Sequence, residues 1–292
     1  MKMKKRKKLK LFDGILYIVM TLLGIVTLIP VLKVVAEALS DPKYVILGEV
    51  GIFPKGFTLE TIQFVLGRVE FLNSFKVTVI ITIGGTLLAM MLTVLAAYPL
   101  SKPGLRGRKF FLYIFVFVML FHAGMVPNYL LFRSLGLINT IWALIFPSAF
   151  SVFNLFIVKN YFEGLPESVE EAAKIDGASN TKTFFTVVLP MSSPVLATVT
   201  LFYGVNYWNS YFSGIMYITN PKLKSLQQYL YDLIKMTSAT DMSVTDVEAL
   251  ATLSGDAVRS ATILVSTLPI LILYPYLQKY FVKGITIGSV KG

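Results

Sequence analysis

The chain has 292 residues, of which 55% are hydrophobic, and its mean hydropathy is +0.70. This composition exceeds what a soluble domain of this size needs for its core, so it predicts an integral membrane protein. The formal net charge of +11 does not indicate nucleic acid, because many basic residues directly precede an apolar run, where they suit anionic lipid headgroups, and the absence of cysteine excludes disulfides and thiolate metal ligands.

The N-terminal segment combines a basic start with an apolar run from Phe12 to Leu32. The small-x-small pattern Ala36-Glu37-Ala38 would fit a cleaved signal peptide, but the run is longer than the about 7–15 apolar residues of a signal sequence. It approaches the ~20 residues that span a bilayer, which favours an uncleaved first span. The basic residues before the run are Lys2, Lys4, Lys5, Arg6, Lys7, Lys8 and Lys10.

The next two spans are predicted from apolar runs that flank a basic turn. Residues 37–70 are polar and carry too few basic residues for a cytoplasmic segment, so they are predicted to form an external loop. An apolar run from Val77 to Leu100 precedes the turn Ser101–Lys109, which is dense in Lys and Arg and is therefore assigned to the cytoplasm. The third span is expected from Phe110 to about Met125, followed by an external connection from Pro127 to Asn139.

The fourth span is expected from about Thr140 to Val158 and the fifth from about Phe184 to Val205. Pro190 and Pro194 should bend the fifth span, which membrane helices tolerate where neighbouring groups satisfy the freed carbonyls. Residues 206–256 are too polar to span and are predicted to form an external subdomain or a re-entrant excursion.

The sixth span is expected from about Ala261 to Leu277. The two termini and the loops Ser101–Lys109 and 159–183 together hold more Lys and Arg than the other connecting segments. Both termini are therefore predicted to be cytoplasmic. The predicted organisation is a basic N-terminus with the first span (1–36), an external loop (37–70), a membrane core (71–283) with a cytoplasmic loop (159–183) and an external segment (206–256), and a cytoplasmic tail (284–292).

A polar segment between the fourth and fifth spans runs from Glu163 to Ser179. Pro166 suits the first position of a helix, because its missing N–H would be unpaired there, and the acidic residues after it suit the positive end of the helix dipole. Gly177 can take the left-handed conformation that ends a helix, and Ser179 or Thr181 can cap the next one. The segment therefore predicts a helix, a sharp turn and a second helix.

One face of this predicted helix is small and largely apolar. Val169, Ala172, Ala173 and Asp176 recur on it at helical spacing. Such a face can press closely against a partner protein. The alternative is an amphipathic surface helix that only joins two membrane spans, and the pattern alone leaves both interpretations open.

The same residues resemble the Glu-Ala-Ala loop of permease subunits in binding-protein-dependent ABC importers. The matching residues are Glu171-Ala172-Ala173, Asp176-Gly177-Ala178 and Leu189-Pro190. The resemblance extends from about Phe71 to the C-terminus and is greatest for the maltose-type oligosaccharide permeases. The other matching segments are Pro127-Asn128-Tyr129, Leu135-Gly136-Leu137, Trp142-Ala143-Leu144-Ile145, Trp208-Asn209 and Gly284-Ile285-Thr286-Ile287-Gly288.

This resemblance implies an all-α, multi-pass protein of the cell membrane, with about six spans of bilayer length and a cytoplasmic coupling helix. It implies one half of a translocation pathway for a sugar or oligosaccharide. The implied partners are a second homologous permease, two copies of a cytoplasmic ABC ATPase and an external solute-binding protein. The residues that the resemblance assigns to ATPase coupling are Glu170, Glu171, Ala172, Ala173, Asp176, Gly177 and Ala178.

The energy source is constrained by which ionisable groups lie within the predicted spans. Their centres hold a single candidate, His122, which is better explained as a hydrogen-bonded structural residue than as a proton relay. Ion-coupled secondary transport is therefore disfavoured, although a Na⁺ site of backbone carbonyls stays open. The sequence contains no Gly-Lys-Ser or Gly-Lys-Thr and hence no P-loop, so ATP energy has to come from a partner.

The sequence offers no catalytic constellation. It has one histidine, no cysteine and no paired carboxylates within a predicted span. We therefore expect no catalytic residues, no cofactor and no metal site. A membrane enzyme that uses external residues such as Asp241, Asp246 and Glu248 is the remaining alternative of this class.

Two polar stripes within predicted spans are candidates for a substrate pathway. Hydroxyl, amide and aromatic groups suit a neutral polyhydroxylated solute, whose rings stack on aromatic side chains and whose hydroxyls need partners. The alternative is that these residues hold neighbouring helices together. The residues are Ser148, Ser151 and Asn154 in the fourth span, and Thr200, Tyr203, Asn206 and Tyr207 in or next to the fifth.

Overall fold

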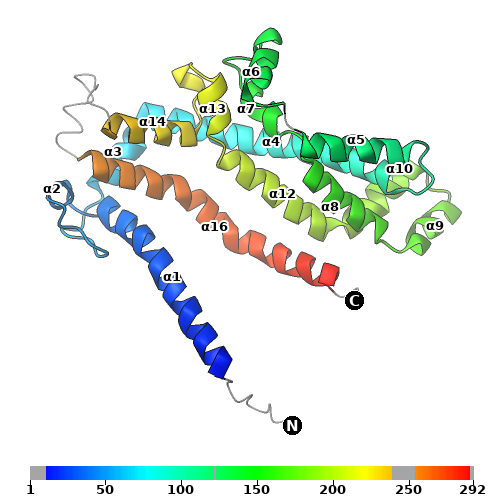
Figure 1. Cartoon of the computed structure of the whole chain (residues 1–292), viewed down its shortest axis with the longest axis horizontal. Helices are drawn as coiled ribbons and strands as arrows, with labels where there is room; N and C mark the ends of the chain where they lie inside the picture. Colours follow the sequence, from blue (N-terminus) through cyan, green and yellow to red (C-terminus); the bar gives the residue numbers. More distant parts are fainter. Residues whose placement is uncertain (1–10, 122, 239–253, 290–292) are drawn as a thin grey trace. The chain divides into compact units, whose positions relative to one another are not determined.

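The computed structural model describes residues 11–121, 123–238 and 254–289. Within these ranges the regular structure is helical, and the sole β-type pairing is an isolated bridge between Ser40 and Phe57. The predicted all-α class is therefore confirmed (Figure 1). The elements are α1 (Leu11–Ala38), α2 (Pro42–Ile46), α3 (Glu60–Gly67), α4 (Val69–Ser101), α5 (Arg108–Leu120), α6 (Met125–Ser134), α7 (Trp142–Ile145), η1 (Phe146–Ser148), α8 (Val152–Glu163), α9 (Glu167–Ile175), α10 (Asn180–Thr183), η2 (Phe184–Val188), α11 (Leu189–Met191), α12 (Ser193–Trp208), α13 (Phe212–Tyr217), η3 (Pro221–Leu223), α14 (Leu226–Ser238) and α16 (Gly255–Ser289).

Several helices in the described part of the chain are long and apolar enough to cross a membrane. Three of them meet this condition alone, within α1, α4 and α16. Three bent pairs meet it together, so the number of spans rises to as many as 6 if each pair is one span. The pairs are Arg108–Leu120 with Met125–Ser134, Trp142–Ser148 with Val152–Glu163, and Asn180–Met191 with Ser193–Trp208.

The bends lie where prolines and glycine interrupt the helical hydrogen bonds. The two parts of the fifth predicted span meet at 79° next to Ser192, in agreement with the bend expected from Pro190 and Pro194. The fourth predicted span is also bent, by 52°, after the proline-containing turn η1. The third is shorter than expected, because α5 ends at Leu120 and α6 begins after Gly124, whose φ is +82°.

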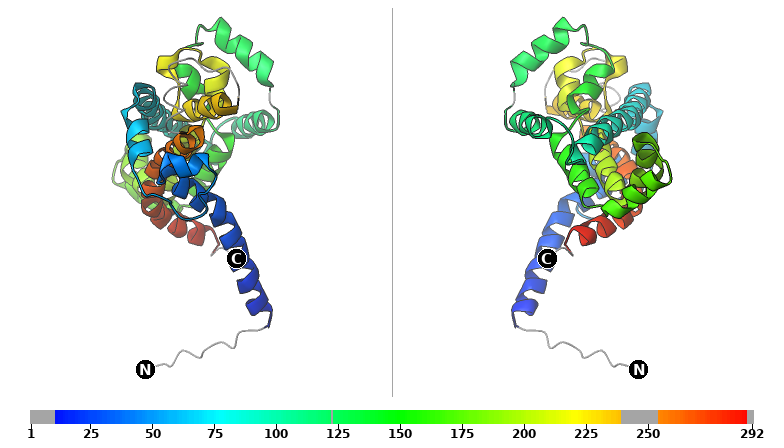
Figure 2. Two further views of the ribbon diagram at one scale, coloured as in Figure 1. Left: turned by 90° about the vertical axis from the view of Figure 1, so that its left-hand side faces the viewer. Right: turned by 90° about the vertical axis from the view of Figure 1, so that its right-hand side faces the viewer.

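The structure divides into two compact units, and the first comprises Met1–Arg68 and Leu233–Ser266. Helix α1 continues through Pro30 and is unbroken in both views of Figure 2. Its apolar side chains are exposed over most of its length, which suits a helix whose surroundings are hydrocarbon. One cluster of buried apolar residues in this unit consists of Ala36, Val45, Val50 and Ala257.

The second unit comprises Val69–Asp232 and Thr267–Gly292, and it is organised around the long helix α4. Helices α8 and α12 both pack along α4 (Figure 1). Tyr207 of α12 lies directly over Gly85 of α4, where an added Cβ would stand 2.6 Å from the tyrosine ring. The Tyr207 hydroxyl donates to the Ile145 carbonyl at 2.8 Å. Glycine at residue 85 therefore permits the close approach of these helices.

Candidate functional site

The polar segment between the fourth and fifth predicted spans forms the expected helix, α9. Pro166 immediately precedes this helix as its N-cap residue, one residue before the position predicted for it. Gly177 has a φ of +77°, as predicted, and the N–H groups of Gly177 and Ala178 donate to the carbonyls of Lys174 and Ala173 at 3.0 and 2.9 Å. This pair of bonds is a Schellman motif, which ends a helix at a left-handed residue.

Helix α10 follows at once, so the predicted helix–turn–helix is present. The Ser179 hydroxyl accepts a hydrogen bond from the Lys182 N–H at 3.3 Å and caps this short helix. Between the two helices the chain reverses within Asp176–Ser179. The sequence therefore determines both the position and the sharpness of this turn.

Helix α9 is an open element, because none of its residues is buried in the chain. Glu171, Ala172 and Asp176 are exposed, whereas Val169, Glu170 and Ala173 are partly buried. Sequence reasoning missed Ile175, whose side chain is 86% exposed next to these residues. Single exposed apolar side chains are common on protein surfaces, so Ile175 is a candidate contact for a partner protein only through its place beside Glu171 and Ala172.

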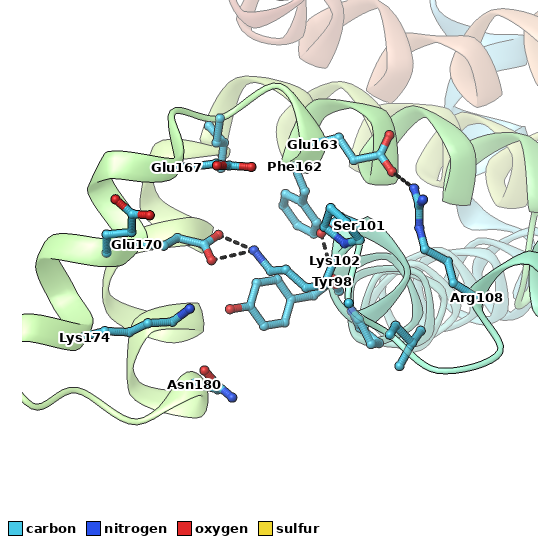
Figure 3. Close-up of a pocket in the computed structure, with 16 residues that line it drawn as sticks. Tyr98, Ser101, Lys102, Arg108, Phe162, Glu163, Glu167, Glu170, Lys174 and Asn180 are labelled. Atoms are coloured by element: carbon cyan, nitrogen blue, oxygen red, sulfur yellow. Dashed lines mark hydrogen bonds and ion pairs between the residues drawn. The ribbon is translucent and has the colours of Figure 1, made fainter.

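A cavity of about 770 Å³ lies between α9 and the end of α4. Its wall includes Tyr98, Lys102 and Phe162 on one side and Glu170 and Lys174 of α9 on the other (Figure 3). The Lys102 ammonium group donates to both carboxylate oxygens of Glu170 and lies 4.7 Å from the centre of the Tyr98 ring. Glu170 is therefore bound within this chain, while Glu171 lies on the exposed surface.

A second group of charges fixes the start of α5 to the end of α8. Arg108 pairs with Glu163, and its Nε donates to the Leu100 carbonyl at 2.8 Å. Glu163 also pairs with Lys159 at 2.8 Å, and Lys159 is buried. A buried ammonium group needs such a partner, because its desolvation would otherwise be costly. The charge of the turn that holds Lys102 and Arg108 predicted its cytoplasmic side but not these ion pairs, because the carboxylate partners of both residues lie more than fifty positions away in the chain.

The two polar stripes contact each other at Tyr203 and Ser151. The Tyr203 hydroxyl lies 2.7 Å from Thr93 Oγ1 of α4 and accepts a hydrogen bond from the Ser151 N–H at 3.0 Å. Tyr203, Tyr207 and Asn154 are buried, and the two tyrosines bridge helices in this chain. Ser148 and Ser151 are partly buried, and Thr200 and Asn206 are exposed. A lining role for the stripes stays a prediction.

A small hydrogen-bonded cluster joins two loops after α6 and α13. Asn139, with a φ of +59°, accepts hydrogen bonds from the N–H groups of Thr219 and Asn220 at 2.7 and 2.9 Å. The Tyr217 ring stacks on Phe132 with 4.6 Å between ring centres, and burial raises the pKa of the Tyr217 hydroxyl. The cluster consists of neutral side chains, and the direction of this pKa shift keeps the tyrosine hydroxyl in its protonated form.

Two sets of predicted residues lie outside the described part of the chain. They are His122, and the external residues Asp241, Asp246 and Glu248. Among the described residues, no group of three or more His, Cys, Asp or Glu side chains is placed to hold a metal ion.

Comparison with known proteins gives consistent matches. Residues 85–287 match the family described as "Binding-protein-dependent transport system inner membrane component". Protein LplC of Bacillus subtilis (strain 168) is 41% identical over 271 residues, covering 92% of this chain and 91% of LplC. The polygalacturonan/rhamnogalacturonan transport system permease protein YtcP of the same organism is 36% identical over 285 residues, covering 98% and 100%.

One solved structure is similar to this chain over almost its whole length. It is a chain of a bacterial ABC transporter involved in the import of the acidic polysaccharide alginate. The TM-score is 0.87 and the sequence identity 33%, with 94% of this chain and 100% of that chain covered.

Proposed function

Because the chain belongs to the family of binding-protein-dependent transport system inner membrane components, we propose that it is a permease subunit of an ATP-driven ABC importer. In this role it forms one half of a translocation pathway with a second, homologous permease. An external solute-binding protein delivers the solute, and two copies of a cytoplasmic ABC ATPase supply the energy. The chain itself is a multi-pass membrane protein of a transporter family.

Helix α9 is the observation that carries the coupling role. It lies between two membrane segments, ends in a Schellman turn, and leaves its own face open. Glu171, Ala172, Ile175 and Asp176 together present a small, mixed surface of the kind that a groove in a partner can cover. The absence of a P-loop motif in the sequence is consistent with ATP hydrolysis in separate subunits.

The orientation in the membrane follows from the same assignment. The N-terminus and the turn after α4 face the cytoplasm because they are rich in Lys and Arg, and the alternation of the spans then puts the segment that holds α9 and the C-terminus on the same side. The cluster around Asn139 and Tyr217 then faces the exterior, where the binding protein approaches. An importer permease with this orientation belongs in the cell membrane, which is the location that we propose.

The proposed solute is a sugar or oligosaccharide. The names of the relatives support this class, since YtcP is named for polygalacturonan and rhamnogalacturonan and the similar structure for alginate. Exposed Thr200 and Asn206 offer hydroxyl and amide partners for such a solute. An ion-coupled carrier and a membrane enzyme, the two alternatives, are not what the family description names.

Transport in sealed vesicles tests this function. The chain is co-expressed with a candidate ATPase, second permease and binding protein chosen from its neighbouring genes, and the complex is reconstituted with the binding protein outside and ATP inside. Labelled maltotriose and trigalacturonate serve as a neutral and an acidic probe. We expect uptake of one of them to require both ATP and the binding protein. Uptake that instead follows an ion gradient without ATP would support the carrier alternative.

A further inference from the structure

The covalent connections of α9 leave its orientation poorly constrained. On one side the chain turns at Gly164–Pro166, and on the other it reverses at Gly177. Beyond that reversal, the path to α12 is interrupted again by the 79° bend next to Ser192. Helix α9 contacts α10 and η2 but buries none of its own residues there. A helix held only by such turns could pivot when a partner pushes on it.

Lys102 supplies a third, non-covalent connection. It directly follows α4, and Pro103 keeps it out of the helix, because the residue before a proline disfavours helical backbone. Its side chain passes over the Tyr98 ring to both carboxylate oxygens of Glu170, as Figure 3 shows. The two side chains are only 34% and 15% exposed, so water screens this pair less than a surface ion pair.

The base of this connection is firmly packed. The Tyr98 ring contacts Phe162 of α8 and Phe184 of η2, with ring centres 6.2 and 4.6 Å apart. Helix α4 is in turn the element on which α8 and α12 pack, through contacts such as Tyr207 on Gly85. A movement of α9 that displaces α4 therefore also displaces α8 and α12, the helices that carry the two polar stripes.

We propose that Lys102 is a positioning residue for energy coupling, and that its ion pair with Glu170 fixes α9 to the end of α4. A push on α9 is then passed directly to α4 instead of being absorbed by rotation at the two turns. This inference rests on the proposed function, in which an ATPase delivers that push. Glu170 acts inside this subunit, and Glu171 and Ile175 remain the residues that face the partner.

The ratio of imported oligosaccharide to hydrolysed ATP tests the proposal in the assembled, reconstituted complex. Lys102→Gln should lower this ratio about tenfold, within the range of known coupling free energies, while complex assembly and ATP hydrolysis persist. Lys109→Gln is the matched control, because it removes the same charge at a nearby exposed residue, in the first turn of α5, for which no ion pair occurs among the described residues. An unchanged ratio in assembled Lys102→Gln complexes would overturn the proposal.

Charge exchange separates this role from a direct contact between Glu170 and the ATPase. Lys102→Glu and Glu170→Lys should each lower the ratio, and the double variant should restore it, because the pair forms again in reverse. A double variant as impaired as the single ones would show that Glu170 acts on another group, and it would overturn the proposal.

Cross-linking adds a test that loss of folding cannot imitate. The chain has no cysteine, so Lys102→Cys with Glu170→Cys gives a defined pair for a short bis-methanethiosulfonate reagent, which joins the two thiols through disulfide bonds. The double cysteine variant lacks the ion pair, so its ratio of import to ATP hydrolysis should be low before cross-linking, and the cross-link should raise the ratio because it joins α9 to the end of α4 again. A ratio that stays low in cross-linked complexes would contradict the proposal. Failure of the proposed function would look different, since the wild-type complex itself would show no ATP-dependent import.

Discussion

Residue 85 illustrates how one side chain sets the distance between two helices. The Tyr207 ring occupies the space that a Cβ at this residue would need, and Tyr207 is fully buried with its hydroxyl bound to the Ile145 carbonyl. A Cβ added at Gly84, the preceding residue, would meet nothing within 4 Å, because this glycine is exposed. The two adjacent glycines thus have different roles, and the sequence alone does not distinguish them.

Gly85→Ala should therefore destabilise the protein, and Gly84→Ala should not. The added methyl group forces Tyr207 away from α4, and overpacking of this kind costs about 1–3 kcal/mol. Thermal unfolding of the purified complex measures the difference. Equal unfolding temperatures for the two variants would mean that α4 and α12 are not in this close contact.

Tyr203→Phe separates the two interpretations of the polar stripes. The change keeps the ring but removes the hydroxyl that joins Thr93 to the Ser151 N–H, so the free energy of unfolding should fall by about 1 kcal/mol. If Tyr203 only bridges helices, the apparent KM for the imported oligosaccharide should not change. Thr200→Val, at an exposed residue, is the control that should change KM without lowering stability. A raised KM in Tyr203→Phe at unchanged stability would favour the lining role for this tyrosine.

At the scale of elements, α9 was predictable and its attachment was not. The turn at Gly177 could be predicted locally, because this kind of helix end needs a residue in the left-handed backbone conformation and glycine adopts that conformation readily. The Lys102–Glu170 pair joins residues 68 positions apart, and no local sequence pattern predicts such a contact. The same holds for the bend of 52° before α8, which hydropathy does not record because both parts of the span are apolar.

Gly177→Val tests α9 as a docking element. Nothing lies within 4 Å of an added Cβ at this residue, so the cost is conformational and arises from the φ of +77°. A strain of about 1–3 kcal/mol should shift the end of α9 and weaken co-purification with the ATPase. Gly177→Asn is the matched control, because asparagine tolerates the left-handed region and should retain most of the association. Normal ATPase binding by the valine variant would mean that α9 does not depend on this turn.

At the scale of the whole molecule, the number of spans depends on how the bent pairs are counted. Apolar runs predicted six crossings, and the part of the chain that the structure describes contains three continuous helices and three bent pairs, which are compatible with that number. Each pair is bent at a feature visible in the sequence only as an isolated proline or glycine, such as Pro147 or Gly124. The apolar runs thus predict which segments can cross the membrane, and the prolines and glycine within them indicate where each one can bend, but not the size of the bend.

The last prediction concerns which side of the membrane the loops of the second unit face. The proposed coupling depends on it, because an ATPase in the cytoplasm can reach α9 only if α9 faces the cytoplasm. The chain lacks cysteine, so single substitutions at exposed residues report accessibility without a background. In intact cells an impermeant maleimide should label Lys222→Cys but not Arg106→Cys or Lys182→Cys, which should react only after the membrane is opened. All three residues are exposed in the chain, so burial does not explain a lack of labelling. Labelling of Lys182→Cys from outside would place α9 and α10 on the wrong side for a cytoplasmic ATPase, and the coupling roles of both Glu171 and Lys102 would then fail together.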